Sequence, residues 1–137
     1  MTVRRRTRAR AAAVAAVVAL CLGCNKPAGE PLKITAIDLG PAVTDDKIVR
    51  SPAETFAPTS TIYASIATEG AGNGTLTARW TAADGKLLAE QKQTITPTKA
   101  THFEFHYAPA GGWPVGRHKV VFALDGGGAR TREFEVR

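Results

Sequence analysis

The sequence predicts an all-β fold, a single antiparallel β-sandwich of about seven strands that follows an N-terminal signal helix. Between residues 32 and 136, short runs of residues alternate between apolar and polar side chains, which is the period of a half-buried strand. Turn-forming residues separate these runs at the spacing typical of a sandwich. No window in this region repeats apolar residues at helical spacing, so a helical domain is excluded.

The alternating runs give the strands in order. The first is expected at residues 32–39, followed by a loop and a short apolar pair, Ile48 and Val49. Residues 51–58 contain two prolines and are expected to be irregular. The remaining strands are expected at residues 61–68, 75–81, 86–95, 101–107, 117–124 and 130–136.

One face of each strand is expected to form the core. The dipeptide Asp84-Gly85 predicts a hairpin turn before the run at 86–95, which is longer and more polar than the others and is expected at a sheet edge. The inward-facing residues are expected to be Ile62, Ala64, Ile66, Leu76, Ala78, Trp80, Phe103, Phe105, Tyr107, His118, Val120, Phe122, Leu124, Phe134 and Val136.

Trp80 and the segment 112–126 (GWPVGRHKVVFALDG) carry a family resemblance. Trp80 lies on the third main strand, and the segment is similar to the recurrent ending of bacterial immunoglobulin-like domains, such as those of uncharacterised envelope lipoproteins. The resemblance covers residues 32–136 and lacks the paired cysteines of antibody domains. His118 stands where such endings often have a tyrosine, which puts the tyrosine-corner hydrogen bond in question. The resemblance implies an immunoglobulin-like sandwich without implying a chemistry.

The N-terminal residues have the pattern of an export signal. Five arginines between residues 4 and 10 precede an apolar run of 12 residues at 11–22, which ends at Gly23 and Cys24. The run is shorter than the ~20 residues of a bilayer-spanning helix. The pattern resembles a bacterial lipoprotein signal, although Cys21 stands where leucine is usual. A secretory peptide cleaved without acylation and a retained membrane anchor are the alternatives.

The lipoprotein resemblance implies a division of the chain and a location. Residues 1–23 are removed by cleavage between Gly23 and Cys24, and Cys24 is acylated with fatty chains such as palmitate. Residues 24–31, which are polar and rich in proline and glycine, form a flexible tether, and residues 32–137 form the domain. The protein is then lipid-anchored to a bacterial membrane, either the outer membrane facing the periplasm or the outer leaflet of the cytoplasmic membrane.

The net charge does not indicate a nucleic-acid partner. The chain carries +6, but five of its 18 basic residues lie before the apolar run. Beyond residue 23, therefore, 13 basic residues face 12 acidic ones without any block of like charge. The expected partners are membrane lipid, through acylated Cys24, and an unknown envelope protein or glycan.

The domain offers no recognisable catalytic or metal-binding constellation. Both cysteines belong to the signal or the anchor, so no disulfide, thiolate ligand or cysteine nucleophile remains. His102, Glu104 and His106 share one face of a strand and are interpreted as a solvated polar face. His118 is interpreted as a hydrogen-bonded core or rim histidine. We expect no cofactor, no metal and no enzymatic activity.

Trp113 is the residue in the domain with a candidate contact role. It lies in a loop with Gly111, Gly112, Pro114 and Gly116. An exposed indole there could stack on a carbohydrate or seat a partner, whereas a buried one would cap the end of the sandwich. The sequence therefore favours a membrane-anchored protein-interaction or structural module, with a carbohydrate- or small-ligand-binding module as the alternative and an enzyme or metal carrier as a third hypothesis.

Overall fold

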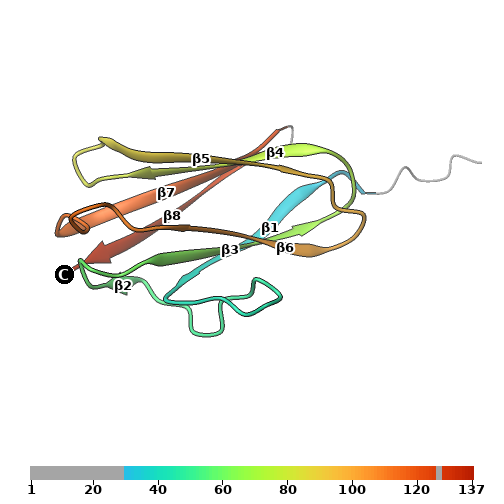
Figure 1. Cartoon of the computed structure of the whole chain (residues 1–137). Coiled ribbons are helices and arrows are strands. Elements are labelled where there is room, and N and C mark those ends of the chain that lie inside the picture. The colour runs from blue at the N-terminus through green and yellow to red at the C-terminus, as the bar shows by residue number, and fades with distance from the viewer. Residues whose placement is uncertain (1–29, 126–127) are drawn as a thin grey trace, which may run out of the picture.

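The computed structural model describes residues 30–125 and 128–137, which form two β-sheets packed face to face (Figure 1). The predicted signal helix and most of the predicted tether lie outside the described residues. Within them there is no helix that could cross a membrane. The strands are β1 (Lys33–Gly40), β2 (Thr55–Phe56), β3 (Ile62–Glu69), β4 (Gly74–Thr81), β5 (Leu87–Ile95), β6 (Thr101–Tyr107), β7 (Gly116–Leu124) and β8 (Gly128–Val136).

The two sheets contain three and five strands, in the orders β1-β3-β6 and β2-β8-β7-β4-β5. Every described pairing between two of these strands is antiparallel except that of β2 with β8, which is parallel. The prediction of one β-sandwich is confirmed. The prediction of seven strands missed β2, which lies in the segment expected to be irregular. Its two residues pair with Glu135 and Val136, and the N–H groups of Glu135 and Arg137 donate to the carbonyls of Glu54 and Phe56 at 2.7 and 3.1 Å.

The core fills the space between the sheets with the apolar faces that the alternation predicted. Trp80 is fully buried at its centre, and its ring centroid lies 6.4 Å from that of Phe122 and 6.2 Å from that of Phe134. All the residues predicted to face inward are buried except Phe103 and Tyr107, which are half-buried. Both lie on β6, an edge strand, where the opposite sheet covers less of the side chain.

The side of the sandwich between β5 and β6 is closed by side chains. β5 lies at the edge of its sheet, as predicted, and follows a tight turn in which Gly85 has a φ of 87°. The amide of Gln91 accepts a hydrogen bond from Trp80 Nε1 at 2.9 Å and donates one to the carbonyl of His106 at 2.8 Å. The Tyr107 hydroxyl donates to the carbonyl of Leu88. These bonds tie the buried indole to both edge strands.

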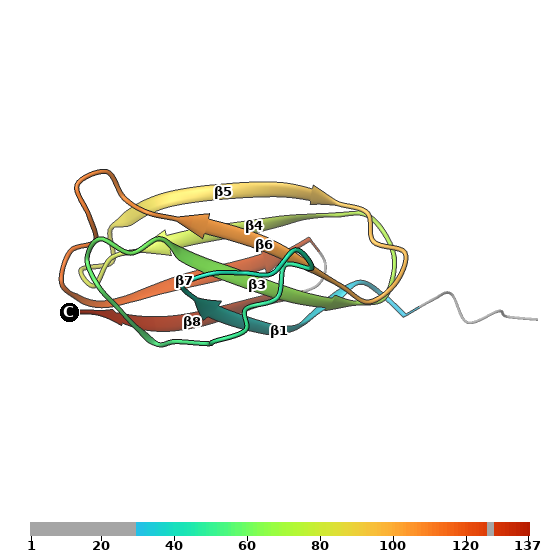
Figure 2. The same cartoon turned by 60° about the horizontal axis from the view of Figure 1, so that its bottom comes forward.

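The long connection between β1 and β2 folds back over the smaller sheet, and Figure 2 shows it crossing in front of β3. It contains no strand at Ile48 and Val49; Val49 is buried and Ile48 is exposed. The Ser65 hydroxyl on β3 donates to the carbonyl of Lys47 at 2.7 Å, which holds the connection against the sheet. This explains why Ser65, a polar residue, is buried.

The two ends of the described chain lie at opposite ends of the sandwich (Figure 1). Glu30 enters at the end that carries the β3–β4 and β5–β6 connections, where the N–H of Ala71 donates to the Glu30 carbonyl at 3.2 Å. The C-terminus lies at the other end, with the β2–β3, β4–β5 and β6–β7 connections. A tether attached at Glu30 therefore leaves the domain from the end opposite to the Trp113 loop.

Candidate functional site

The β6–β7 loop carries Trp113 back into the molecule. Gly111 and Gly112 have φ values of 86° and 89°, a conformation that favours glycine and turns the chain sharply. The backbone N–H of Trp113 then donates to the carbonyl of Pro58 at 2.8 Å, and its indole Nε1 donates to the carbonyl of Ser60 at 2.8 Å. Both bonds join the β6–β7 loop to the β2–β3 loop.

The Trp113 indole is 3% exposed and closes the end of the core. Its ring centroid lies 5.8 Å from that of Trp80, 5.4 Å from that of Tyr107 and 5.3 Å from that of Phe134. A platform for a sugar or partner needs an open aromatic face, and in this structure the face of Trp113 is covered. Trp113 therefore caps the end of the core, which was the alternative to its being an exposed binding platform.

His118 is a second buried polar residue at this end, 2% exposed, at the start of β7. Its Nε2 is hydrogen-bonded to the carbonyl of Pro114, four residues upstream, and its ring stacks on Phe134 at a centroid distance of 5.5 Å. A tyrosine corner makes the same kind of upstream bond from its hydroxyl near the start of the corresponding strand. Histidine thus supplies the bond that the sequence put in question, although Nδ1 is buried without a partner.

The polar face of β6 does not form a metal site. The Nδ1 of His106 contacts a carboxylate oxygen of Glu104, and the His106 ring lies 5.2 Å from the ring of Tyr63, measured between centroids. Among the described residues no three histidine, cysteine or carboxylate side chains converge closely enough to hold a metal ion. The arrangement of Glu104 and His106 is that of a surface pair beside an aromatic ring.

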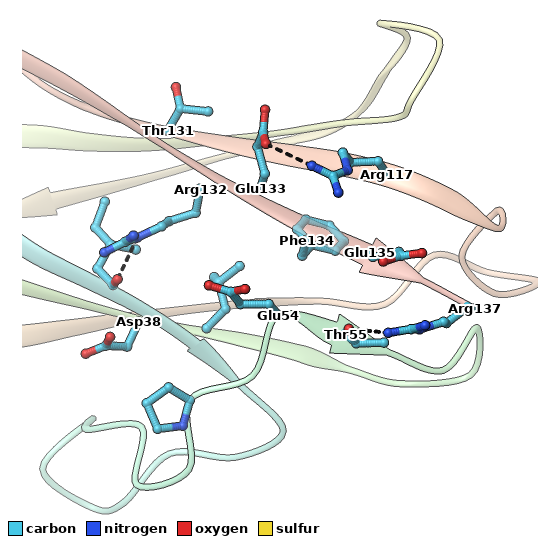
Figure 3. Close-up of a pocket in the computed structure, with 13 residues that line it drawn as sticks. Asp38, Glu54, Thr55, Arg117, Thr131, Arg132, Glu133, Phe134, Glu135 and Arg137 are labelled. Atoms are coloured by element: carbon cyan, nitrogen blue, oxygen red, sulfur yellow. Dashed lines mark hydrogen bonds and ion pairs between the residues drawn. The ribbon is translucent and has the colours of Figure 1, made fainter.

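An open groove of about 700 Å³ lies between β1 and β8 and is referred to below as the β1–β8 groove (Figure 3). Residues 37–39 of β1 form one wall, residues 131–135 of β8 form the other, and Pro52, Glu54 and Thr55 lie beside them. Its surroundings are charged as well as apolar: Arg132 and Glu133 stand beside Phe134. A groove of this volume is in the usual range of ligand sites, about 300–1,000 Å³.

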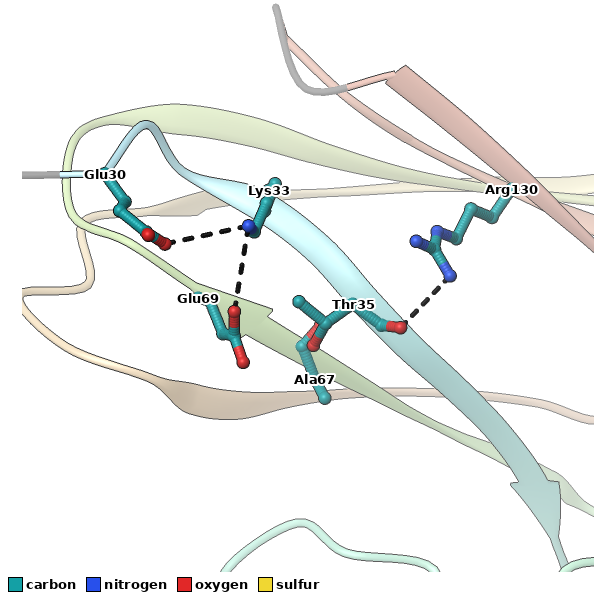
Figure 4. A network of polar contacts seen from close by, with 6 residues as sticks. All are labelled: Glu30, Lys33, Thr35, Ala67, Glu69 and Arg130. Atoms are coloured by element: carbon teal, nitrogen blue, oxygen red, sulfur yellow. Dashed lines mark hydrogen bonds and ion pairs between the residues drawn. The ribbon is translucent and has the colours of Figure 1, made fainter.

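Two arginines of β8 donate to main-chain carbonyls of β1, and one of them, Arg132, lines the groove. Arg132 Nε donates to the carbonyl of Ile37 at 2.8 Å, and Arg130 donates to the carbonyl of Thr35 at 3.1 Å (Figures 3 and 4). Neither arginine has a carboxylate within ion-pair distance among the described residues, whereas Lys33 at the start of β1 lies between Glu30 and Glu69 (Figure 4). The remaining donors of both guanidinium groups are therefore available to a ligand.

Sequence reasoning missed this groove. The sequence does contain a signal for it. Arg130 and Arg132 lie an even number of positions before the buried residues Phe134 and Val136, and alternate residues of a strand share one face, so both arginines lie on the core-facing side of β8. Two charges on an otherwise apolar face mark a place where the opposite sheet does not cover the strand.

Gly23 and Cys24, the predicted cleavage and acylation positions, lie outside the described residues.

No protein-family model matches the chain, and no curated protein matches it in sequence. Among solved structures, an immunoglobulin-like protein from Pseudomonas aeruginosa is 10% identical, with 78% of this chain and 97% of that chain covered and a TM-score of 0.51. A β-glucosidase from Erythrobacter marinus is 10% identical, with 78% and 15% covered and a TM-score of 0.53.

An alkylpurine DNA glycosylase from Pseudomonas fluorescens, bound to DNA containing an abasic site analog, is 15% identical, with a TM-score of 0.52. The match covers 77% of this chain and 30% of the glycosylase. This chain thus spans less than a third of each of these two enzymes. At such low identities the likeness concerns the fold alone. The described part of the chain is an immunoglobulin-like β-sandwich.

Proposed function

We propose that the chain is an exported bacterial lipoprotein whose immunoglobulin-like domain, held at a membrane by acylated Cys24, serves as a protein-interaction or structural module. The observation that carries the proposal is the succession of an arginine-rich segment, a 12-residue apolar run and the pair Gly23-Cys24 directly before the domain. A fold of this class is suited to presenting surfaces and is often found without catalytic chemistry.

The position of Glu30 supports a defined orientation. The chain enters the sandwich at one end, so a lipid on Cys24 would hold that end toward the membrane and leave the Trp113 loop pointing away (Figure 1). Between Cys24 and Glu30 only five residues intervene, which keeps the domain close to the bilayer. Fatty chains anchor stably when at least two are present, and a multiply acylated cysteine supplies them.

The proposal includes an envelope location, a protein partner and the absence of catalysis. The location is the outer membrane facing the periplasm or the outer leaflet of the cytoplasmic membrane. A carbohydrate-binding function through Trp113 is not put forward, because the hydrogen bond to Ser60 and the ring contacts with Trp80 keep that indole out of reach.

Metabolic labelling with an alkyne fatty acid tests the anchor. The wild-type chain is expected to take up label and to remain in the membrane fraction, whereas Cys24→Ser is expected to lose the label and keep its signal segment. Cys21→Ser is the matched control, because it removes the neighbouring cysteine and should leave labelling unchanged. Labelling that persists in Cys24→Ser, or that disappears in Cys21→Ser, would contradict the proposal.

A further inference from the structure

Part of β8 is a sheet edge with its main-chain groups free. The N–H groups of Glu135 and Arg137 point outward and donate to residues of the β2 segment. The register of β8 against β7 is unbroken, so the N–H and C=O groups of Thr131 and Glu133 point the same way by the alternation of an antiparallel ladder. The pairing of β2 with β8 does not extend beyond Glu135. The N–H and C=O groups of Thr131 and Glu133 therefore have no main-chain partner among the described residues.

Side chains bridge single main-chain carbonyls on the other strand edges of the sandwich. On β1, a bulge lies between Ile34 and Ala36, and arginine side chains occupy two of its carbonyls. On the opposite side of the sandwich, the Gln91 side-chain amide donates to the carbonyl of His106 on β6, and the Tyr107 hydroxyl donates to the carbonyl of Leu88 on β5. Proteins usually protect exposed edges in such ways because an open edge pairs with other strands. Among the described residues, no such side-chain bridge reaches the main-chain groups of Thr131 and Glu133.

The lining of the β1–β8 groove includes Thr131 and Glu133, so the groove lies directly beside this open stretch (Figure 3). Strand β2 already shows how a segment pairs with β8: it adds to the same edge through main-chain hydrogen bonds. An added strand would continue from the point where β2 stops. Its side chains on the core-facing side would meet Arg130 and Arg132, whose guanidinium groups have no carboxylate partner among the described residues.

A second copy of this chain is a poor occupant of the edge. In an antiparallel pair of two β8 strands about a twofold axis, residues of one face lie opposite each other. If the axis passes through residue 130 or 132, an arginine lies opposite the same arginine of the other copy. If it passes through residue 131, Arg130 of each copy lies opposite Arg132 of the other. If it passes through residue 133, the two copies of Glu133 lie opposite each other. Like charges directly opposite destabilise a pair of strands.

We infer that the β8 edge binds an extended acidic peptide segment of a partner protein as an added strand. The main-chain groups of Thr131 and Glu133 provide the pairing, and Arg130 and Arg132 select carboxylate side chains at alternate positions. The inference rests on the proposed function, since it specifies how the interaction module recognises its partner.

Selection from a display library of random seven-residue peptides against the full-length protein in detergent tests the inference. We expect enriched peptides with Asp or Glu at alternate positions. Each enriched peptide is then synthesised, and its affinity for the protein is measured by fluorescence anisotropy. A second version of each peptide, methylated at alternate backbone nitrogens, is measured in the same way. Methylation removes the pairing donors without changing the protein, so it is expected to weaken binding at least tenfold.

Protein variants locate the contact. Thr131→Pro removes an outward N–H that the fold does not use, and is expected to weaken binding at least tenfold. Arg132→Gln is expected to weaken it three- to tenfold, whereas Arg79→Gln, on the exposed face of β4, should have no effect. The melting temperature of each variant shows whether it is folded.

Several results would overturn the inference: no enrichment, enrichment of basic peptides, or equal affinity for methylated peptides. Concentration-dependent dimers that Thr131→Pro abolishes would instead assign the edge to a second copy. Acylation of Cys24 is measured without reference to β8, and peptide selection does not require the lipid. Failure of one proposal can therefore be told from failure of the other.

Discussion

Replacing Trp113 with alanine tests whether this residue caps the core. A tryptophan side chain that is 3% exposed buries ~200 Å² of surface, which corresponds to about 5 kcal/mol at ~25 cal/mol per Å². Residual burial in the unfolded chain lowers this figure to about 3–4 kcal/mol. Loss of the indole also leaves the carbonyl of Ser60 without its donor, a cost of about 1 kcal/mol. The expected loss of stability is therefore about 4 kcal/mol, within the range of roughly 3–5 kcal/mol for such substitutions.

Thermal unfolding, followed by circular dichroism, measures the effect. For a domain of about 100 residues, 1 kcal/mol corresponds to roughly 4–8 °C, so Trp113→Ala is expected to lower the melting temperature by about 16–32 °C. Val115→Ala is the matched control: the residue lies in the same loop but is 73% exposed, and its truncation should change stability by less than ~0.5 kcal/mol. A loss below about 1 kcal/mol for Trp113→Ala, or equal losses for both variants, would refute the capping role.

Two further pairs of variants test local features of the fold by the same thermal assay. Gly70→Ala should lower the free energy of unfolding by more than about 2 kcal/mol, because φ is +86° and the new Cβ would lie 2.4 Å from the carbonyl oxygen of Glu30. Gly85 has a similar φ but open space around it, so Gly85→Ala should cost about 1 kcal/mol. Equal losses for the two variants would contradict this prediction. His118→Phe should cost less than about 1 kcal/mol, since it keeps the stack on Phe134 and removes a buried nitrogen that lacks a partner. His118→Ala should cost about 2–3 kcal/mol by opening a cavity, and a phenylalanine variant as unstable as the alanine variant would show that the Nε2 bond to Pro114 dominates.

The sandwich was predictable because its signals are local. Alternation at Leu76, Ala78 and Trp80 reports directly which face of the strand is buried, and Asp84-Gly85 reports the turn that follows. Strand β2 could not be read in this way, since two residues between prolines carry no period. Its pairing depends on a β8 strand that lies about 80 residues further along the chain.

The features of the surface depend on contacts between distant residues. Whether Trp113 is exposed is decided by the carbonyls of Pro58 and Ser60, which lie more than 50 residues away in the chain. The β1–β8 groove likewise requires knowing that Arg130 and Arg132 reach strand β1, 95 positions earlier. The sequence showed two charges on an apolar face, but only the arrangement of the sheets shows what they bridge.

Mass spectrometry of the N-terminal peptide of the mature protein, isolated from bacterial membranes, tests the central claim most directly. The account predicts a peptide that begins at Cys24 and carries a diacylglyceryl group on the sulfur and a fatty acyl group on the amine. An N-terminal peptide that retains residues 1–23, or one that begins near residue 24 with an unmodified cysteine, would contradict the account.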